Sequence, residues 1–155
     1  VTAGNASGIN DAAAALLLMA EEKARDLGVQ PLAKIKAYSS AGLDPAYMGL
    51  GPIPAVRKIL AGHNHLITDF DSIELNEAFA AQSLPVLKDL DLLDDMDSKV
   101  NVHGGACAQG HPIGSTGSRI IVTLMYALKQ KGLKRGIAAL CIGGGEATAL
   151  AIELP

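Results

Sequence analysis

The 155-residue sequence contains no tryptophan, only 3% aromatic residues and only two cysteines. Without large rings or a disulfide framework, its core must be built from aliphatic side chains, which suits helices layered on a sheet. Hydrophobic residues make up 49% of the chain, and a domain of this length can bury a substantial core. We therefore expect one α/β domain over residues 1–155.

The sequence also lacks an excess of positive charge, since its formal net charge is -3 at pH 7. Nucleic acid and anionic membranes are therefore not expected as partners. The longest apolar run, residues 12–20, is too short to cross a bilayer, and no charged-then-apolar leader opens the sequence. Cys107 and Cys141 form no C-x-x-C pair and fit a reducing compartment. These absences predict a soluble, cytoplasmic protein.

Hydrophobic patterning predicts four strands, at residues 33–39, 71–76, 135–142 and 147–154, and three helices, at residues 54–60, 77–88 and 117–131. Residues 12–20 are ambiguous. Propensity merges them with residues 21–27 into one helix ended by Gly28, whereas their continuous apolar run also fits a strand buried on both faces. The helix at 117–131 is apolar on almost every side, so we expect a neighbour outside this chain to cover part of it.

A glycine-rich stretch with a single histidine, residues 104–117, precedes that helix. Glycine allows positive φ and a close approach of the backbone to a ligand. Pro112 follows His111 directly and biases it toward an extended conformation. A solvated surface histidine is the alternative interpretation, but the local rigidity favours a chemical site. The stretch has no Lys-Ser/Thr ending and is therefore not a P-loop.

Further polar groups stand at the ends of predicted strands. Asn76 ends one strand and Glu77 opens the helix that follows, which makes both of them site candidates, with helix capping by Asn76 as the alternative. Cys141 ends another strand directly before three glycines, and a buried structural thiol is the alternative there. A neighbouring imidazole lowers a thiol pKa, which would let Cys141 act as nucleophile or base, with the N–H of Gly143 facing an oxyanion. No residue pattern indicates a metal site, because His63 and His65 have no further ligands nearby.

Three motifs follow one another in the sequence: Asn-Glu-Ala-Phe-Ala at 76–80, a segment at 104–114 that begins Gly-Gly-Ala and ends Gly-His-Pro-Ile-Gly, and Cys-Ile-Gly-Gly-Gly at 141–145. With residues 2–8 and 48–55, they resemble the C-terminal half of the thiolase family, the acetyl-CoA C-acetyltransferases and 3-ketoacyl-CoA thiolases. The resemblance covers essentially the whole chain.

The resemblance implies a thiolase-type α/β half with element order βαβαβαββ, a five-stranded mixed sheet and helices on both faces. It makes residues 13–19 the first strand and residues 21–27 the first helix, because burial on both faces overrides the helical preference of alanine. It also places a homologous N-terminal half against the apolar helix at 117–131.

The resemblance further implies a role for each candidate group. His111 activates a nucleophilic cysteine and helps bind the thioester oxygen, and Asn76 orders a water in that oxyanion hole. Cys141 is the acid/base at the α-carbon of acetyl-CoA, and the N–H of Gly143 donates to a second oxyanion hole. The expected reaction is the reversible condensation of two acetyl-CoA, or thiolysis of a 3-ketoacyl-CoA, in fatty acid metabolism.

Met48 and Phe79 are implied as walls of the substrate pocket. Acetyl-CoA and other acyl-CoA thioesters are the expected substrates, with no separate cofactor and a homo-oligomer for the complete enzyme. The family's acyl-accepting cysteine and its CoA-binding loop domain belong to the N-terminal half, which this sequence lacks. The chain is therefore expected to be inactive alone.

Two other hypotheses stay open at this point. A ketoacyl synthase is disfavoured, because that related family lacks the cysteine followed by a glycine triplet. A non-catalytic thiolase-like module for dimerisation or acyl-CoA binding is motivated by the absent nucleophile. Three residues depart from the family pattern and bear on pocket shape rather than on reaction class: Cys107, Gln109 and Glu146.

Overall fold

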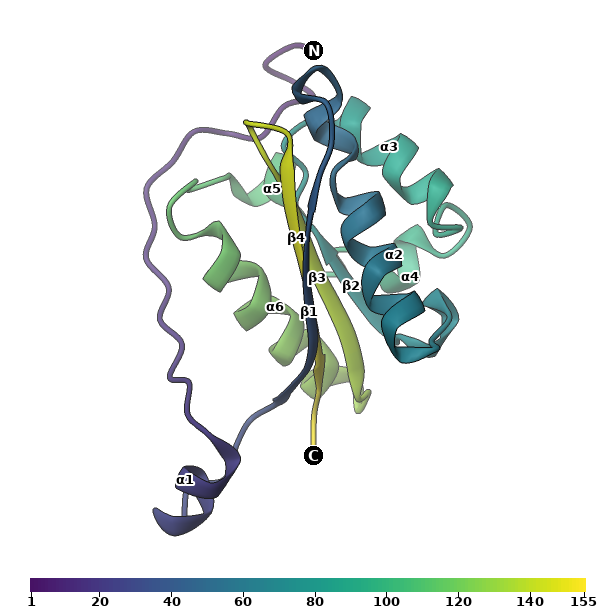
Figure 1. Ribbon diagram of the computed structural model, residues 1–155. Coiled ribbons are helices and arrows are strands. Elements are labelled where there is room, and N and C mark those ends of the chain that lie inside the picture. Colours follow the sequence, from purple (N-terminus) through teal and green to yellow (C-terminus); the bar gives the residue numbers. More distant parts are fainter.

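A four-stranded mixed sheet forms the centre of the domain in the computed structural model, which describes residues 1–155 (Figure 1). Its strands are β1 (Lys34–Gly42), β2 (Ser72–Leu75), β3 (Arg135–Ile142) and β4 (Glu146–Glu153). They are arranged in the order β1-β4-β3-β2. The β2–β3 pair is parallel, and the two pairs that involve β4 are antiparallel. The predicted α/β class and the strand pair at the C-terminal end of the sequence are confirmed.

Helices cover both faces of this sheet, as predicted. In Figure 1, α2 (Pro52–His63) and α3 (Ala80–Asp89) lie on one side of the sheet and α6 (Thr116–Lys131) lies on the other. The remaining elements are short: α1 (Glu21–Asp26), η1 (Pro45–Leu50), η2 (Ile67–Asp69), α4 (Met96–Lys99) and α5 (Ala106–Gln109).

The two faces of the sheet are buried to different extents. Successive strand residues point to opposite faces, so Ile73 and Ile137 join the core on the α2 side, whereas Ala138 and Ile152 pack toward α6. The core on the α2 side has 18 buried residues and the core on the α6 side has only 5. The α6 face is therefore the less completely covered side of the domain.

A groove runs beside α6 on this thinner face. It is lined by Ile121 of α6 and by Tyr38, Leu140 and Leu150 of the sheet. The Tyr38 side chain is 81% exposed, which is unusual for an aromatic residue on a central sheet. This apolar groove agrees with the expectation that α6 is only partly covered within this chain.

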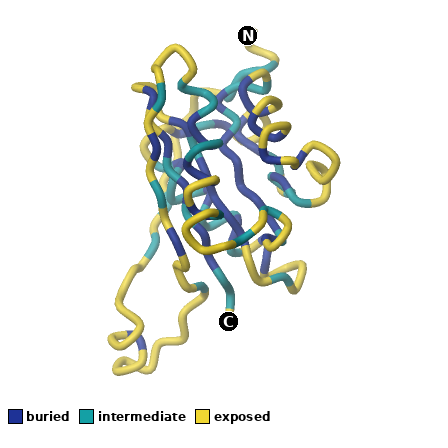
Figure 2. The backbone as a smooth tube through the Cα atoms, turned by 45° about the vertical axis from the view of Figure 1, so that its right-hand side comes forward, coloured by how far each residue is buried: buried dark blue, intermediate teal, exposed yellow.

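Residues 13–19 form no strand, and the sheet has four strands where five were predicted. Residues 9–20, here called the arm, arch away from the sheet and lead into α1 (Figure 1). Figure 2 shows the arm exposed along almost its whole length. Leu17, for example, is 85% exposed. A strand exists only through pairing, and neither sheet edge pairs with the arm.

The single long helix that propensity favours for residues 12–27 is also absent, because a short helix without a packing surface is marginal in water. Only α1 forms, close to the predicted helix at 21–27. Elsewhere the helix expected from residue 77 begins at Ala80, because Phe79 is extended with φ near -143°. None of the helices is long and apolar enough to cross a membrane.

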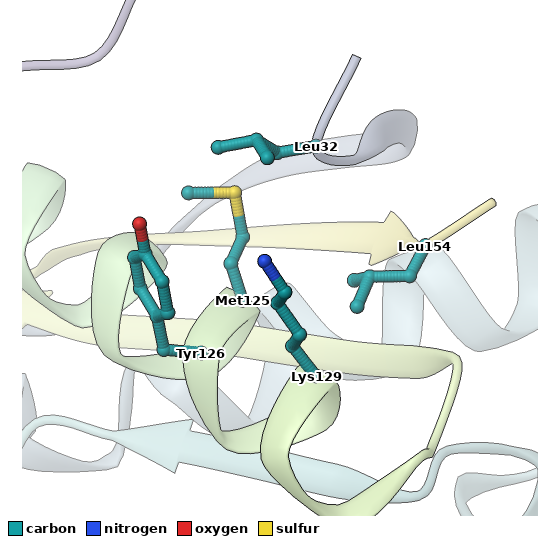
Figure 3. Close-up of a pocket in the computed structure, with 5 residues that line it drawn as sticks. All are labelled: Leu32, Met125, Tyr126, Lys129 and Leu154. Atoms are coloured by element: carbon teal, nitrogen blue, oxygen red, sulfur yellow. The ribbon is translucent and has the colours of Figure 1, made fainter. Parts of the chain in front are cut away.

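A small hollow lies near the C-terminal end of α6. Figure 3 shows the side chains that line it, which are those of Leu32, Met125, Tyr126, Lys129 and Leu154. Four of the five are hydrophobic, and the only charged group is that of Lys129. It also lies more than two turns along α6 from Thr116, the first residue of that helix, where the polar groups described next gather.

Candidate functional site

Two of the sequence-predicted groups lie at one end of the sheet. Because β2 and β3 are parallel, their carboxyl ends share an edge, which is where α/β sheets place ligands. Asn76 directly follows β2, and its backbone N–H donates to the carbonyl of Ala139 at 3.0 Å. Cys141 is the penultimate residue of β3. Neighbouring strands therefore bring Asn76 and Cys141 to the same edge.

The glycine-rich loop brings His111 to this edge. The backbone N–H of His111 donates to the carbonyl of Gly8 at 2.8 Å, and the N–H of Ser7 donates to Ala78 at 3.1 Å. These bonds join the first residues of the chain to both the loop and the segment after β2. The His111 Nε2 atom then lies 3.4 Å from the Asn76 side-chain nitrogen. Asn76 does not cap α3, so the capping alternative is wrong.

Thr116, which the sequence analysis missed, fixes the orientation of the imidazole. Its hydroxyl donates to the carbonyl of Pro112 at 3.0 Å and lies 2.7 Å from Nδ1 of His111. A hydroxyl has one hydrogen, so it accepts the second bond, which assigns the proton of the neutral ring to Nδ1. Nε2 then carries the lone pair and accepts from the Asn76 amide. The arrangement presents a base at Nε2.

The surroundings of His111 favour its neutral form. Burial lowers the pKa of His111 below its ordinary value, and the nearby Arg119 cation lowers it further. Both effects disfavour imidazolium, because the charged form loses hydration and meets a like charge. The ring is therefore held as a base at neutral pH.

Glu77 joins the strand end to the glycine-rich loop. Its carboxylate accepts from the Asn101 side chain at 2.9 Å and from the backbone N–H of Cys107 at 3.0 Å. The carboxylate rests against Gly105, where any Cβ would overlap it. Glu77 thus has a structural task here, holding the loop that carries His111.

We expect Gly105→Ala to destabilise the domain by about 2–4 kcal/mol, because the added methyl group displaces the Glu77 carboxylate from both hydrogen bonds. Urea unfolding monitored by circular dichroism measures the change. Gly114→Ala, in the same loop, is the matched control, since its Cβ would meet open space. Equal stability of the two variants would contradict the role given to Glu77.

Cys141 is buried, with 7% of its surface exposed. Burial raises the pKa of the Cys141 thiol, and no hydrogen bond joins the thiol to His111. The expectation that a neighbouring imidazole lowers this pKa is therefore wrong for the chain by itself. At neutral pH the group is a thiol, which is the form that donates a proton.

The glycine triplet after Cys141 forms the turn between β3 and β4. Gly145 takes a positive φ of 91° and donates its N–H to the carbonyl of Ile142 at 3.1 Å. Gly143 is exposed, and its N–H donates no backbone hydrogen bond. A free N–H two residues after Cys141 is what an oxyanion-binding role at Gly143 requires.

Met48 and Phe79 lie on elements that pack together. Met48 belongs to η1, which packs against α3, and Phe79 is the residue before α3. Both side chains are partly buried. Gln82 of α3 is buried, and neither of its side-chain polar atoms has a hydrogen-bond partner. No group of three or more histidine, cysteine or acidic side chains is arranged to hold a metal ion.

Glu74 of β2 is a second group that the sequence analysis missed. It is 1% exposed, and its Oε1 atom has no hydrogen-bond partner. Burial raises the pKa of Glu74 to about 7, an effect that Arg119 opposes and Glu77 reinforces. The strand pattern carried a signal, since an acidic residue stood between two aliphatic ones in a short strand.

The stability of the Glu74→Gln variant relative to the wild type should increase as pH rises. The folded state binds the Glu74 proton more tightly than the unfolded state, so this group's contribution to stability is lost between about pH 4.5 and above pH 7. Over this pH range the contribution of Glu74 to the free energy of unfolding falls by as much as about 3 kcal/mol. Denaturant unfolding at pH 5, 7 and 8.5 measures it, with Asp97→Asn as an exposed control. A pH-independent difference would contradict the burial of an unpaired carboxyl.

The comparisons with known proteins agree on one family. Residues 29–154 match the family described as "Thiolase, C-terminal domain". The chain is 61% identical over 153 residues to an acetyl-CoA acetyltransferase of Syntrophomonas wolfei subsp. wolfei, covering 99% of this chain and 38% of that protein. It therefore spans about two fifths of the length of such relatives.

Solved structures give the same result. The crystal structure of the Bacillus anthracis acetyl-CoA acetyltransferase matches with a TM-score of 0.95 and 56% identity, over 100% of this chain and 39% of that one. The crystal structure of human mitochondrial 3-ketoacyl-CoA thiolase in complex with CoA matches with a TM-score of 0.90 and 41% identity, over 100% of this chain and 39% of that one.

Proposed function

Because the chain belongs to the thiolase family and carries its C-terminal domain, we propose that it supplies the acid/base half of an acyl-CoA C-acyltransferase. The observation that supports this most is the contact of 3.4 Å between His111 Nε2 and the Asn76 amide, at the sheet end where β3 presents Cys141. Acetyl-CoA and 3-ketoacyl-CoA are the proposed substrates, with coenzyme A as co-substrate.

In the proposed reaction, His111 takes the proton of a nucleophilic cysteine supplied by an N-terminal half. The thiolate attacks the thioester carbonyl of acetyl-CoA, and coenzyme A leaves as the acetyl-enzyme forms. His111 and a water ordered by Asn76 are proposed to face the thioester oxygen, where negative charge develops. Nε2 is suited to taking the thiol proton because it carries the lone pair of a ring that is held neutral.

Cys141 acts on the second acetyl-CoA. In condensation Cys141 first loses its thiol proton to solvent, and the thiolate then removes the α-proton. The resulting carbanion attacks the acetyl-enzyme, which releases acetoacetyl-CoA and the nucleophilic cysteine as a thiolate. In thiolysis the Cys141 thiol protonates the departing enolate. Burial raises the pKa of Cys141, so the resting group already holds the proton that thiolysis uses. The free N–H of Gly143 is proposed as the donor to the enolate oxygen, and Met48 and Phe79 as pocket walls.

The proposed partner is a homologous N-terminal half that contributes the nucleophile. The apolar groove beside α6 and the exposed arm are the surfaces left for it, since both present large apolar side chains to solvent. We further propose that this chain does not turn over alone, that the complete enzyme is a homo-oligomer, and that it works in the cytoplasm, where the two free cysteines stay reduced.

The test is thiolysis of acetoacetyl-CoA by the complete enzyme, made by joining this chain to the N-terminal half. His111→Ala and Cys141→Ala should each reduce kcat by ~10²–10⁴-fold, the usual worth of a placed proton transfer. His103→Ala and Cys107→Ala are the matched controls, because both side chains are exposed. Full activity of the His111 and Cys141 variants would leave this chain as a non-catalytic module.

A further inference from the structure

Three buried polar atoms without hydrogen-bond partners belong to two side chains of opposite charge. They are Oε1 of Glu74 and the Nε and one Nη of Arg119. Because its neighbours Ile73 and Leu75 join the core on the α2 side, alternation along β2 turns Glu74 toward α6, and Arg119 belongs to the first turns of α6. The two charges act on each other, because Arg119 opposes the effect of burial on Glu74. Buried polar atoms on charged groups nearly always have hydrogen-bond partners, so the three atoms without partners need an explanation.

The place of Arg119 is unfavourable by itself. It lies four residues after Ser115, the N-cap of α6, where the helix dipole disfavours a cation. It also stands beside His111, whose protonated form it repels. A lysine or arginine on the solvent side of α6 would meet neither cost. A role for the Arg119 cation in holding the glycine-rich loop and the His111 ring would explain why it lies at this position.

Arg119 also reaches the loop that carries the histidine. Its remaining Nη lies 3.4 Å from Oε1 of Gln109, and the Gln109 amide donates to the carbonyl of His103 at 2.6 Å. Three residues before Arg119 on the same helix, Thr116 holds Nδ1 of His111. The first turns of α6 thus contact the loop on both sides of the histidine.

We infer that Arg119 is a positioning residue, which ties the glycine-rich loop to α6 through Gln109 so that His111 presents Nε2 as a base, with the buried Glu74 carboxyl nearby on β2. The inference rests on the proposed function of His111 as a base. The Arg119 cation acts on Glu74 from β2 and on His111 from the loop, and the negative charge of Glu77 acts in turn on Glu74. The lowered pKa of His111 agrees with this placement.

The test compares Arg119→Met with Arg119→Lys in the complete enzyme. The titration of His111 is followed by NMR of labelled histidine, with the resonance assigned through His111→Asn, and the pH profile of kcat/KM is recorded. Without the cation, Arg119→Met should raise the titration midpoint of His111 and the acid limb of kcat/KM by about one pH unit. Arg119→Lys keeps the charge and should keep both midpoints while kcat falls, because the contact with Gln109 is lost.

The outcomes separate this inference from the proposed function. Arg57→Met, on the opposite face of the sheet, controls for the loss of an arginine and should move neither midpoint. A merely structural role would lower the melting temperature and the activity equally at all pH values, and an unmoved His111 midpoint in folded Arg119→Met overturns the inference. Should Arg119→Met not fold, the neutral Arg119→Gln takes its place with the same two readouts. Full activity of His111→Ala would overturn the proposed function, while the NMR titration would still report on Arg119.

Discussion

In the complete enzyme, Cys141→Ala is expected to accumulate the acetylated nucleophile while condensation falls by ~10²–10⁴-fold. The reason is that Cys141 takes no part in the hydrogen bonds that position His111 and Asn76. The side chains of His111 and Asn76 contact each other through Nε2, and His111 also bonds to Thr116 and to the first residues of the chain. Removing the thiol therefore leaves the groups proposed for acylation in place.

His111→Ala should give the opposite pattern, because the base proposed for the first half-reaction is lost and no acetyl-enzyme forms. Intact-mass measurement after mixing with acetyl-CoA reports the acetylated fraction, and product formation reports condensation. Cys107→Ala is the control for loss of a cysteine, since its thiol is exposed. If Cys141→Ala failed to become acetylated although folded, the division of roles between the two groups would be wrong.

Gly145→Ala is expected to cost about 3–5 kcal/mol of folding free energy, which would leave little folded protein at 37 °C. Gly145 has φ of 91°, a region that L side chains rarely adopt. A Cβ there would also overlap the carbonyl oxygen of Leu43 and come within 3.1 Å of the backbone nitrogen of Pro45. Backbone atoms cannot rotate away as the end of a side chain can, so the strain has no easy outlet.

Gly143→Ala is the matched control from the same turn, because a Cβ there meets nothing within 4 Å and the residue has no positive φ. It keeps the backbone N–H proposed as an oxyanion donor, so both stability and activity should be largely retained. Thermal unfolding of the two variants side by side gives the comparison. Near-equal melting temperatures would show that the turn relaxes around an added methyl group.

Much of the sheet was predictable because local patterns carried it. Alternation marked β1, and aliphatic runs around a glycine triplet marked β3 and β4. The arm shows the limit of that method. Its apolar run satisfies the pattern of a buried strand, yet pairing is a long-range property and nothing in this chain pairs with it. Propensity favoured a helix over these residues, and it was the family resemblance that predicted the strand.

The site divides in the same way. His111, Asn76 and Cys141 were identifiable because each stood at the end of a predicted element beside glycine or a helix start. Thr116 and Arg119 were not, because their roles depend on which atoms they meet after folding. The environment of Cys141 was predicted wrongly for a related reason. The sequence places a histidine and a cysteine in one chain, but not at a distance that couples their protons.

The arm is a closed loop rather than a free tail. Its first end is fixed where Gly8 accepts a hydrogen bond from His111, and beyond its other end Glu21 of α1 pairs with Lys34 of β1 at 2.7 Å. The entropy of bringing those ends together is therefore lost when the domain folds, not when a partner binds. A partner that orders the arm bears only the cost of fixing the backbone in between, about 1–2 kcal/mol per residue.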